Sequence, residues 1–193
     1  MRHEGGPRHH VRVFREPGRQ VPTVHGTVAF RQLPEALRNV TYSGARHPGA
    51  TTPECPSYVA GGAAGVPGQG PVPGPFDDLA GGANCQRYAY AVLRHFGLLI
   101  PPLRSAELWA DERATHRVER PRPLDLVLFD SGPADGRPPG YGAHVGVHLG
   151  PDQVLHLCRE AGRPAVWRYA DFAARPRYGR FLGVKRAGRA EEG

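Results

Sequence analysis

The residues best suited to chemistry are one cysteine and two histidines that follow it in the chain. The stretch "GGANCQRYAYAVLRHFGL", residues 81 to 98, places Cys85 directly after a glycine-rich turn and at the start of an amphipathic pattern. A thiol in this place is either a small buried apolar group or a nucleophile. The positive end of a helix and a nearby imidazolium both stabilise a thiolate, which lowers the thiol pKa from its usual ~8.5. A nucleophilic Cys85 therefore needs a histidine beside it.

Two later segments provide such histidines on predicted strands. Alternate residues of a strand share a face, so in "AHVGVHLG" His144 and His148 point one way and the valines between them the other. In "VLHLCRE", His156 and Cys158 share a face. The turn "GPDQ" at residues 150 to 153 suits a hairpin, which would bring His144 and His156 onto neighbouring strands.

This set has the composition of a nucleophile, a base and an orienting residue. His144 would take the proton of Cys85 and return it to a leaving amine. His156 would accept a hydrogen bond from the other ring nitrogen of His144 and so fix its tautomer. Backbone N–H groups around Asn84 and Cys85, free at the helix start, would bind the oxyanion of a tetrahedral intermediate.

Other readings use the same residues. Each of the cysteines and histidines can be an ordinary core residue. A zinc ion held by Cys85, His144, His156 and Cys158 is a further alternative, but no ligands have tight spacing such as CxxC. We therefore predict no metal site and no cofactor.

The elements that must position these side chains form an α+β plan. Apolar residues from Cys85 to Phe96 follow one helix face, with Asn84 as the N-cap and Gly97 as the stop. "LPEALRNV" offers a helical turn, "SAELWADE" a short helix capped by Ser105, and "ADFAARPR" another brief helix. Short strand patterns separated by Gly, Pro and Asp fill the C-terminal half: "LDLVLFD", "HVGVHLG", "QVLHLCRE", "PAVWRY" and "RFLGVKR".

The N-terminal part has a different composition. Residues 1–50 carry strand-like runs, "HVRVF" and "TVHGTVAF", but too few apolar residues for an independent domain. We expect a partly ordered N-terminal extension there, a main domain over residues 51–187, and a disordered tail at 188–193. Residues 44 to 83 are dense in Gly, Pro and Ala, and a loop of this length is usually functional or disordered.

Composition excludes several classes of protein. The chain has 193 residues and a formal net charge of +7, but its basic residues are scattered and no nucleic-acid-binding motif occurs, so we expect no nucleic-acid partner. No apolar run approaches the ~20 residues that cross a bilayer, so we expect no membrane partner. The first residues lack the apolar segment of a secretory signal, and three cysteines without a CxxC pair suit a reduced compartment. These features favour a cytoplasmic protein.

Three segments, in order, resemble the NlpC-type cysteine peptidases, papain-like enzymes of bacterial cell-wall turnover. "ANCQRYAYAVLRHFGL" with "PLRSAELWAD" is similar to the family's nucleophile helix and the segment after it. "RPLDLVLF" is similar to its "RPGDLVFF" strand, and "HVGVHLGPDQVLH" to its "HVGIYLGDGRVIH" hairpin. The resemblance covers residues 76 to 186. It implies a papain-like NlpC-type fold, with a nucleophile helix packed on an antiparallel sheet, over the core 76–186 of an NlpC-type cysteine hydrolase domain at 51–187.

The resemblance also implies roles for single residues. It makes Cys85 the nucleophile, His144 the base and His156 the orienting residue. A family tyrosine in a "YxWGG" stretch near the oxyanion site is matched best by Tyr58 in "YVAGG". The family commonly has Asp-Cys-Ser-Gly at the nucleophile, whereas this chain has Asn84-Cys85-Gln86-Arg87, so Gln86 and Arg87 are expected to reshape the pocket beside the thiol.

A second departure is Leu124, which replaces the glycine of the family's "PGD" turn. We expect Asn84, Tyr58 and Gln86 to contact the oxyanion or the substrate.

The predicted function is hydrolysis of an amide bond through a Cys85 thioester, on a small peptide or peptide-like substrate such as a cell-wall-derived fragment. One alternative is an acyltransferase or amide-forming enzyme of a biosynthetic pathway, which would pass the same acyl group to an amine. The other is a non-catalytic binding protein on this fold. The sequence leaves these three open, and it does not predict an oligomeric state.

Overall fold

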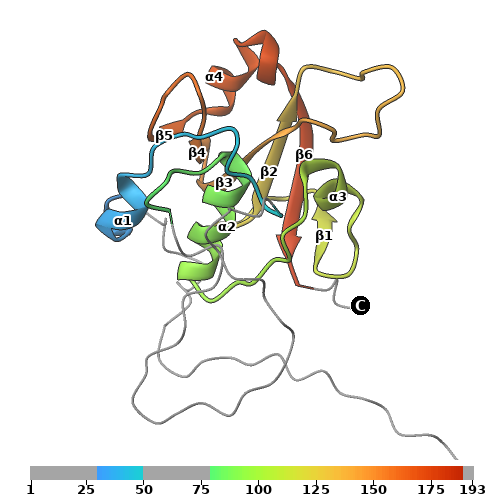
Figure 1. The fold of residues 1–193 in the computed structure, drawn as a ribbon. Coiled ribbons are helices and arrows are strands. Elements are labelled where there is room, and N and C mark those ends of the chain that lie inside the picture. The colour runs from blue at the N-terminus through green and yellow to red at the C-terminus, as the bar shows by residue number, and fades with distance from the viewer. Residues whose placement is uncertain (1–29, 50–78, 189–193) are drawn as a thin grey trace, which may run out of the picture.

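The computed structural model of the protein describes residues 30–49 and 79–188 (Figure 1). The strand-like runs expected at the N-terminus, Tyr58 and most of the Gly/Pro-rich region lie outside these residues, apart from Phe30 in a short 3-10 turn.

A six-stranded sheet is the centre of the fold, and every neighbouring pair of its strands is antiparallel. The strand order is β1-β6-β2-β3-β4-β5. The expected α+β class, with a helix packed on an antiparallel sheet, is confirmed. The strands are β1 (Thr115–Val118), β2 (Leu126–Asp130), β3 (His144–Gly150), β4 (Gln153–Leu157), β5 (Pro164–Trp167) and β6 (Arg180–Ala187).

The sheet separates two hydrophobic cores. Helix α2 (Cys85–His95) packs on β3 and β4, where Val145, Val147 and Leu155 belong to the larger core (Figure 1). The opposite face is covered by α4 (Tyr169–Ala173) and the 3-10 turn η2 (Pro176–Tyr178), and its core contains Phe129 and Phe172. The predicted alternation along β3 is confirmed, because its valines face α2 while the ring of His144 packs against Phe172 on the other side.

Helix α2 begins and ends where the sequence predicts. The Oδ1 of Asn84 accepts the backbone N–H of Arg87 at 2.9 Å, which satisfies one of the free donors of the first turn. Gly97 follows the helix with φ +81°, and the N–H of Leu98 returns to the carbonyl of Leu93. This left-handed residue after the helix terminates it in the usual way.

The helix α3 (Ser105–Ala110) starts one residue earlier than predicted. Arg104, not Ser105, is its N-cap, and the backbone N–H of Arg104 donates to the Glu107 carboxylate at 2.6 Å. The acidic side chain in the first turn therefore replaces the expected serine cap. Strand β1, which the sequence analysis did not predict, follows α3 and pairs with the last strand, β6.

Part of the range expected to be an N-terminal extension is packed into the larger core. Helix α1 (Glu35–Arg38) confirms the predicted helical turn, and Leu33, Leu37 and Val40 are buried. An isolated parallel bridge then joins Tyr42 to Ala83, two residues before Cys85. Residues near position 42 are thereby held beside the start of α2.

The turn before β2 carries a strained residue, Leu124. Leu124 has φ +74°, a left-handed conformation that side chains rarely adopt. Its side chain is buried and belongs to the larger core. Apolar burial thus offsets the backbone strain of this turn.

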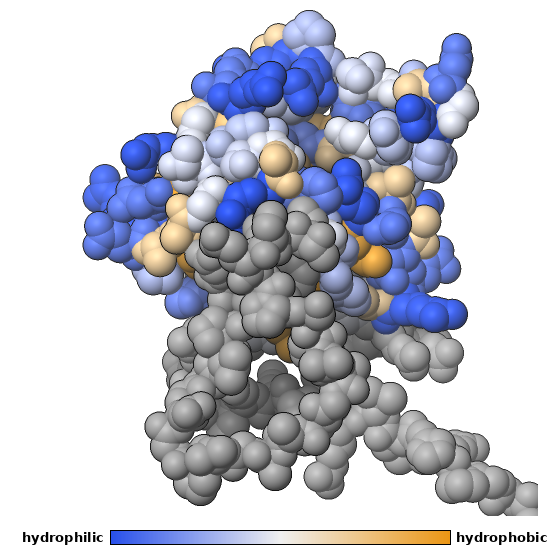
Figure 2. All heavy atoms as spheres, viewed as in Figure 1, coloured by the Kyte–Doolittle hydropathy of each residue, from blue (hydrophilic) through white to orange (hydrophobic). Residues whose placement is uncertain are grey.

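The surface shown in Figure 2 is mostly hydrophilic over the described residues. Among these residues no helix has the length and apolar character needed to cross a membrane.

Candidate active site

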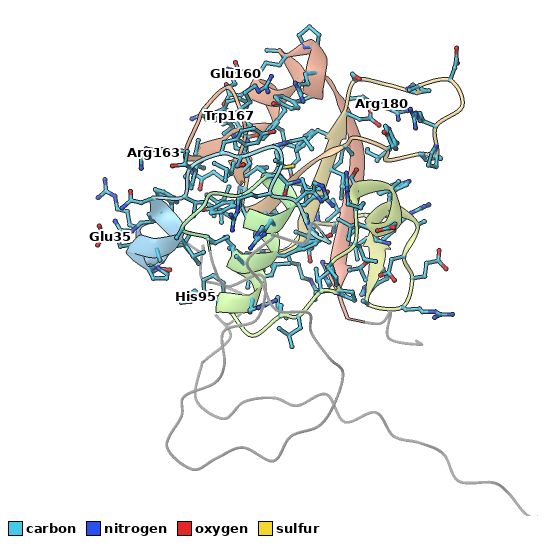
Figure 3. The ribbon with its side chains drawn as sticks, in the orientation of Figure 1. Glu35, His95, Glu160, Arg163, Trp167 and Arg180 are labelled. Atoms are coloured by element: carbon cyan, nitrogen blue, oxygen red, sulfur yellow. The ribbon has the colours of Figure 1, made fainter. Side chains whose placement is uncertain are left out.

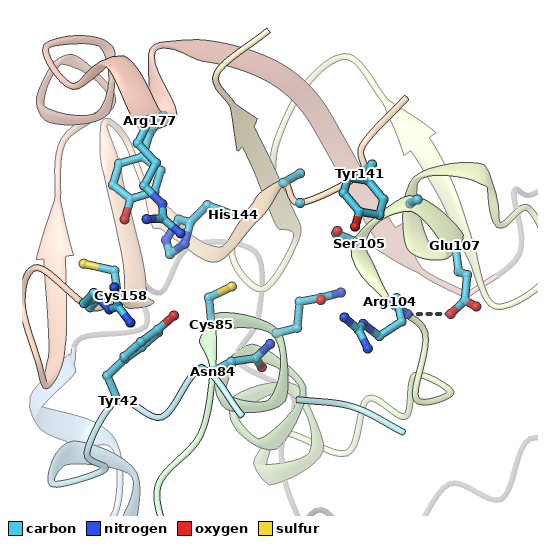
Figure 4. Close-up of a pocket in the computed structure, with 17 residues that line it drawn as sticks. Tyr42, Asn84, Cys85, Arg104, Ser105, Glu107, Tyr141, His144, Cys158 and Arg177 are labelled. Carbon is cyan, nitrogen blue, oxygen red and sulfur yellow. Dashed lines mark hydrogen bonds between the residues drawn. The ribbon is translucent and has the colours of Figure 1, made fainter. Parts of the chain in front are cut away.

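A pocket of about 490 Å³ opens where the first turn of α2 meets the start of β3. Cys85 and His144 both line it, together with Asn84, Gln86 and Tyr42 (Figure 4). Cys85 is the first residue of α2 and His144 is the first residue of β3, so the starts of a helix and of a strand place both side chains at one cavity.

The hairpin brings the two predicted histidines into contact. The turn at residues 150 to 153 is a tight one, with Gly150 opposite Gln153, as predicted. Nε2 of His144 lies 3.0 Å from Nδ1 of His156, and the two rings are nearly perpendicular. This contact leaves Nδ1 of His144 as the nitrogen available for the thiol proton.

A glycine makes room for this contact. Gly146 follows His144 on the same face of β3, and a Cβ at this position would lie 2.5 Å from Val154 Cγ1 and 3.5 Å from the Cβ of His156. A side chain there would therefore displace Val154, β4 or His156.

Burial sets the protonation of the histidine pair. Burial lowers the pKa of His144 well below its ordinary value, and the nearby His156 and Arg177 act in the same direction. Burial also lowers the pKa of His156 to about 3, with a further contribution from Arg175. A neutral His156 can accept the Nε2–H of His144 at its Nδ1, and in that tautomer Nδ1 of His144 carries no proton.

The Cys85 thiol differs from the sequence expectation. Burial raises its pKa, although the backbone N–H groups of Val145, Gln86 and Cys85 favour the thiolate. The helix start and the histidine were expected to lower this pKa, and the expectation is wrong for this structure because desolvation outweighs both and His144 is itself neutral. The site at rest is a thiol beside a neutral imidazole.

Two of the predicted neighbours of Cys85 line the pocket and one does not. Asn84 lines the pocket, but its Oδ1 is occupied by the helix cap. Gln86 also lines the pocket, and its Nε2 donates to the Leu103 carbonyl at 3.2 Å. Arg87 is buried and does not line the pocket. Of the two unusual residues after Cys85, Gln86 is thus the one that shapes the cavity.

Tyr42 is the residue that sequence reasoning missed. It lines the pocket, and Figure 4 shows its hydroxyl directed toward the space beside Cys85. Burial raises the pKa of Tyr42, and a charge on Cys85 would raise it further, so the phenol keeps its proton at neutral pH. The sequence carries a weak signal in "TYSG", but the bridge to Ala83 that places it is not visible from local pattern.

Cys158 is the second thiol of the pocket. It lies on the face that carries His156, as predicted, and its Sγ accepts the N–H of Ala161 at 3.3 Å. Within the described part of the chain, no three of the His, Cys, Asp and Glu side chains form a group that could hold a metal ion. The zinc set considered from the sequence therefore does not assemble.

Comparison with known proteins gives matches only among solved structures. No family model and no curated protein matches the chain. An NlpC/P60 family protein from Bacillus cereus ATCC 10987 is 18% identical, with a TM-score of 0.40, over 55% of this chain and 32% of that one. The peptidoglycan hydrolase RipB from Mycobacterium tuberculosis is 24% identical, with a TM-score of 0.39, over 61% of this chain and 52% of that one. The chain thus spans about a third and about half of these two proteins.

Proposed function

We propose that the protein is a cysteine-dependent amide hydrolase that acts through a Cys85 thioester on a small peptide or peptide-like substrate. One observation carries the proposal: Cys85 and His144 line one pocket, and His144 makes a 3.0 Å contact with a second, buried histidine. The motifs that resemble NlpC-type peptidases contain these same three residues. A nucleophile, a base and an orienting group in contact are what acyl transfer requires.

The proposed reaction has two steps, acylation of Cys85 and hydrolysis of the thioester, and His144 accepts and returns one proton in each. Nδ1 of His144 takes the Cys85 proton as the sulfur attacks the amide carbon. The tetrahedral intermediate collapses when His144 gives that proton to the departing nitrogen, so the C–N bond breaks and a thioester remains. Water then attacks the thioester and loses a proton to His144. The C–S bond breaks, and the proton returns to the sulfur.

The start of α2 and Tyr42 supply the groups that would stabilise the oxyanion. Backbone N–H groups of Cys85 and Gln86 lie close to the thiol. The protonated hydroxyl of Tyr42 can donate a further hydrogen bond into the space beside Cys85. Preorganised donors of this kind act where charge develops in the transition state. We assign to Tyr42 the oxyanion role that the sequence analysis gave to Tyr58.

Acylation by 4-nitrophenyl acetate tests the proposal without knowledge of the natural substrate. We expect a burst of about one equivalent of 4-nitrophenolate, with the acetyl group mapped to the Cys85 peptide by mass spectrometry. Burial lowers the pKa of His144 and raises that of Cys85, so the reactive form, which has one proton between the two groups, spans a wide range of pH. The acid limb of the rate should lie below the ordinary pKa of a histidine, and the alkaline limb above the ordinary pKa of a thiol.

Cys158 is the internal control for this experiment, since it lines the same pocket. Acetyl groups on Cys158 in place of Cys85, or no burst at all, would contradict the proposal.

The Tyr42→Phe variant should lower kcat for acylation by roughly 10²-fold while the protein keeps its stability, because one oxyanion donor is lost and the ring remains. Tyr90→Phe is the matched control: its hydroxyl donates to the Leu103 carbonyl at 3.1 Å from within α2, and it does not line the pocket. Equal rates for the two variants would remove Tyr42 from the mechanism.

A further inference from the structure

Three arginines line the pocket that holds Cys85: Arg104, Arg159 and Arg177. Among the described residues that line it, Glu107 is the one carboxylate, and this group is exposed and accepts the backbone N–H of Arg104. The charge at the pocket is therefore strongly positive. A peptide substrate without charge gives no reason for such a surplus.

Arg159 and Arg177 differ from the other arginines around them. Within residues 30–49 and 79–188, neither guanidinium forms an ion pair or a side-chain hydrogen bond. By contrast, Arg175 pairs with Glu160 at 2.9 Å and lies over the ring of Trp167. Figure 3 labels Glu160 and Trp167. Arg180 and Arg186 pair with carboxylates at 2.7 Å.

The two unpaired arginines lie on the same side of the nucleophile. Arg177 and Cys158, which directly precedes Arg159 in the chain, lie on the side of the pocket away from Arg104 (Figure 4). Both of their charges lower the pKa of Tyr42, so both act on a residue beside the thiol. Arg104, on the opposite side of Cys85, is engaged with the ring of His47 at 3.1 Å.

We infer that Arg159 and Arg177 form an anion subsite, and that the substrate of this pocket carries a carboxylate next to the bond that is cleaved. The inference rests on the proposed amide chemistry at Cys85. Two guanidinium groups without partners gain charge-assisted hydrogen bonds when a carboxylate enters between them, and guanidinium geometry matches a carboxylate in a bidentate manner. A peptide-like molecule supplies that group as its free C-terminus or as an acidic side chain.

The test compares two alkylating reagents that differ only in charge. Iodoacetate carries a carboxylate and iodoacetamide is its neutral counterpart, and the ratio of their rate constants at Cys85 cancels the thiolate fraction. We expect the rate constant for iodoacetate, divided by that for iodoacetamide, to fall on the order of threefold to tenfold in the Arg159→Gln/Arg177→Gln double variant. The same ratio should fall in the parent protein as the salt concentration is raised. Arg113→Gln, an exposed arginine outside the pocket, is the matched control and should leave the ratio unchanged.

Protection against iodoacetamide identifies the kind of anion. N-acetylglycine should protect Cys85 better than N-acetylglycinamide, and the double variant should lose this difference. Stronger protection by methyl phosphate than by N-acetylglycine would overturn the assignment of a carboxylate. If Cys85 is labelled but the ratio of the two rate constants is the same in the parent protein and the double variant, the anion subsite alone would be overturned. Failure of both reagents to label Cys85 would overturn the thiol nucleophile and the subsite together.

Discussion

Replacement of Cys85 by alanine is expected to abolish the acylation burst, with a loss on the order of 10⁴-fold or more in turnover. The proposal assigns the thioester to the sulfur of Cys85, and variants that lack a catalytic nucleophile retain only the rate that binding and oxyanion stabilisation provide. Stopped-flow detection of 4-nitrophenolate measures the burst. The side chain is partly exposed and lies on the first turn of α2, whose cap is made by Asn84, so the free energy of unfolding should change by no more than about 1 kcal/mol.

Cys158→Ala is the control that makes this result specific. Cys158 lines the same cavity and is almost fully buried, so its loss disturbs packing at least as much. The control should retain its burst. A burst that survives in Cys85→Ala and vanishes in Cys158→Ala would show that the nucleophile has been assigned to the wrong thiol.

The two histidines in contact are expected to give unequal losses. His144→Ala removes the proton acceptor, which is worth typically ~10²- to 10⁴-fold in kcat. His156→Ala leaves the base in place but removes the acceptor at 3.0 Å that fixes its tautomer, so the loss should be smaller. In His156→Asn the side-chain carbonyl can accept the same Nε2–H, and much of the activity should return. The reverse order of effects would mean that the two roles are exchanged.

His148→Ala separates these effects from a general cost of losing a buried histidine. His148 lies on the same face of β3, is buried, and contacts the Tyr169 hydroxyl at 3.0 Å outside the pocket. Its variant should keep the acid limb of the pH–rate profile, whereas His156→Ala should move that limb, because the pKa of His144 depends on its neighbour.

The elements that hold Cys85 and His144 could be predicted because local residues specify them. Asn84 and Gly97 mark the two ends of α2, and the apolar face between them has helical period. The two-residue turn after Gly150 places β3 beside β4, but the two histidines share a face only because the register shifts between His148 and Gly150, which the sequence does not mark. The ends of α2 and the turn after Gly150 depend on residues that are neighbours in the sequence, so local patterns indicate them.

Other features depend on distant parts of the chain and could not be predicted. Strand β1 contains Thr115 and His116 and has no apolar alternation, yet it becomes a strand because β6 offers it an edge to pair with. The raised pKa of Cys85 follows from desolvation of the thiol by the groups that pack around it, which no motif encodes. Likewise, the absence of a partner for Arg159 and Arg177 among residues 30–49 and 79–188 appears only when the carboxylates of that part of the chain have been matched with their own partners.

The bridge between Tyr42 and Ala83 has a consequence for how such sites diversify. It joins the two ends of the stretch from residue 43 to residue 82, and the backbone N–H of Ser43 also donates to the carbonyl of Ala83 at 2.8 Å. The entropy of closing a loop grows only logarithmically with its length, so doubling such a stretch costs about 0.6 kcal/mol. Insertions can therefore accumulate between a site tyrosine and its cysteine while both stay in place, and the tyrosine of such a site is better sought by its pairing partner than by its distance along the chain.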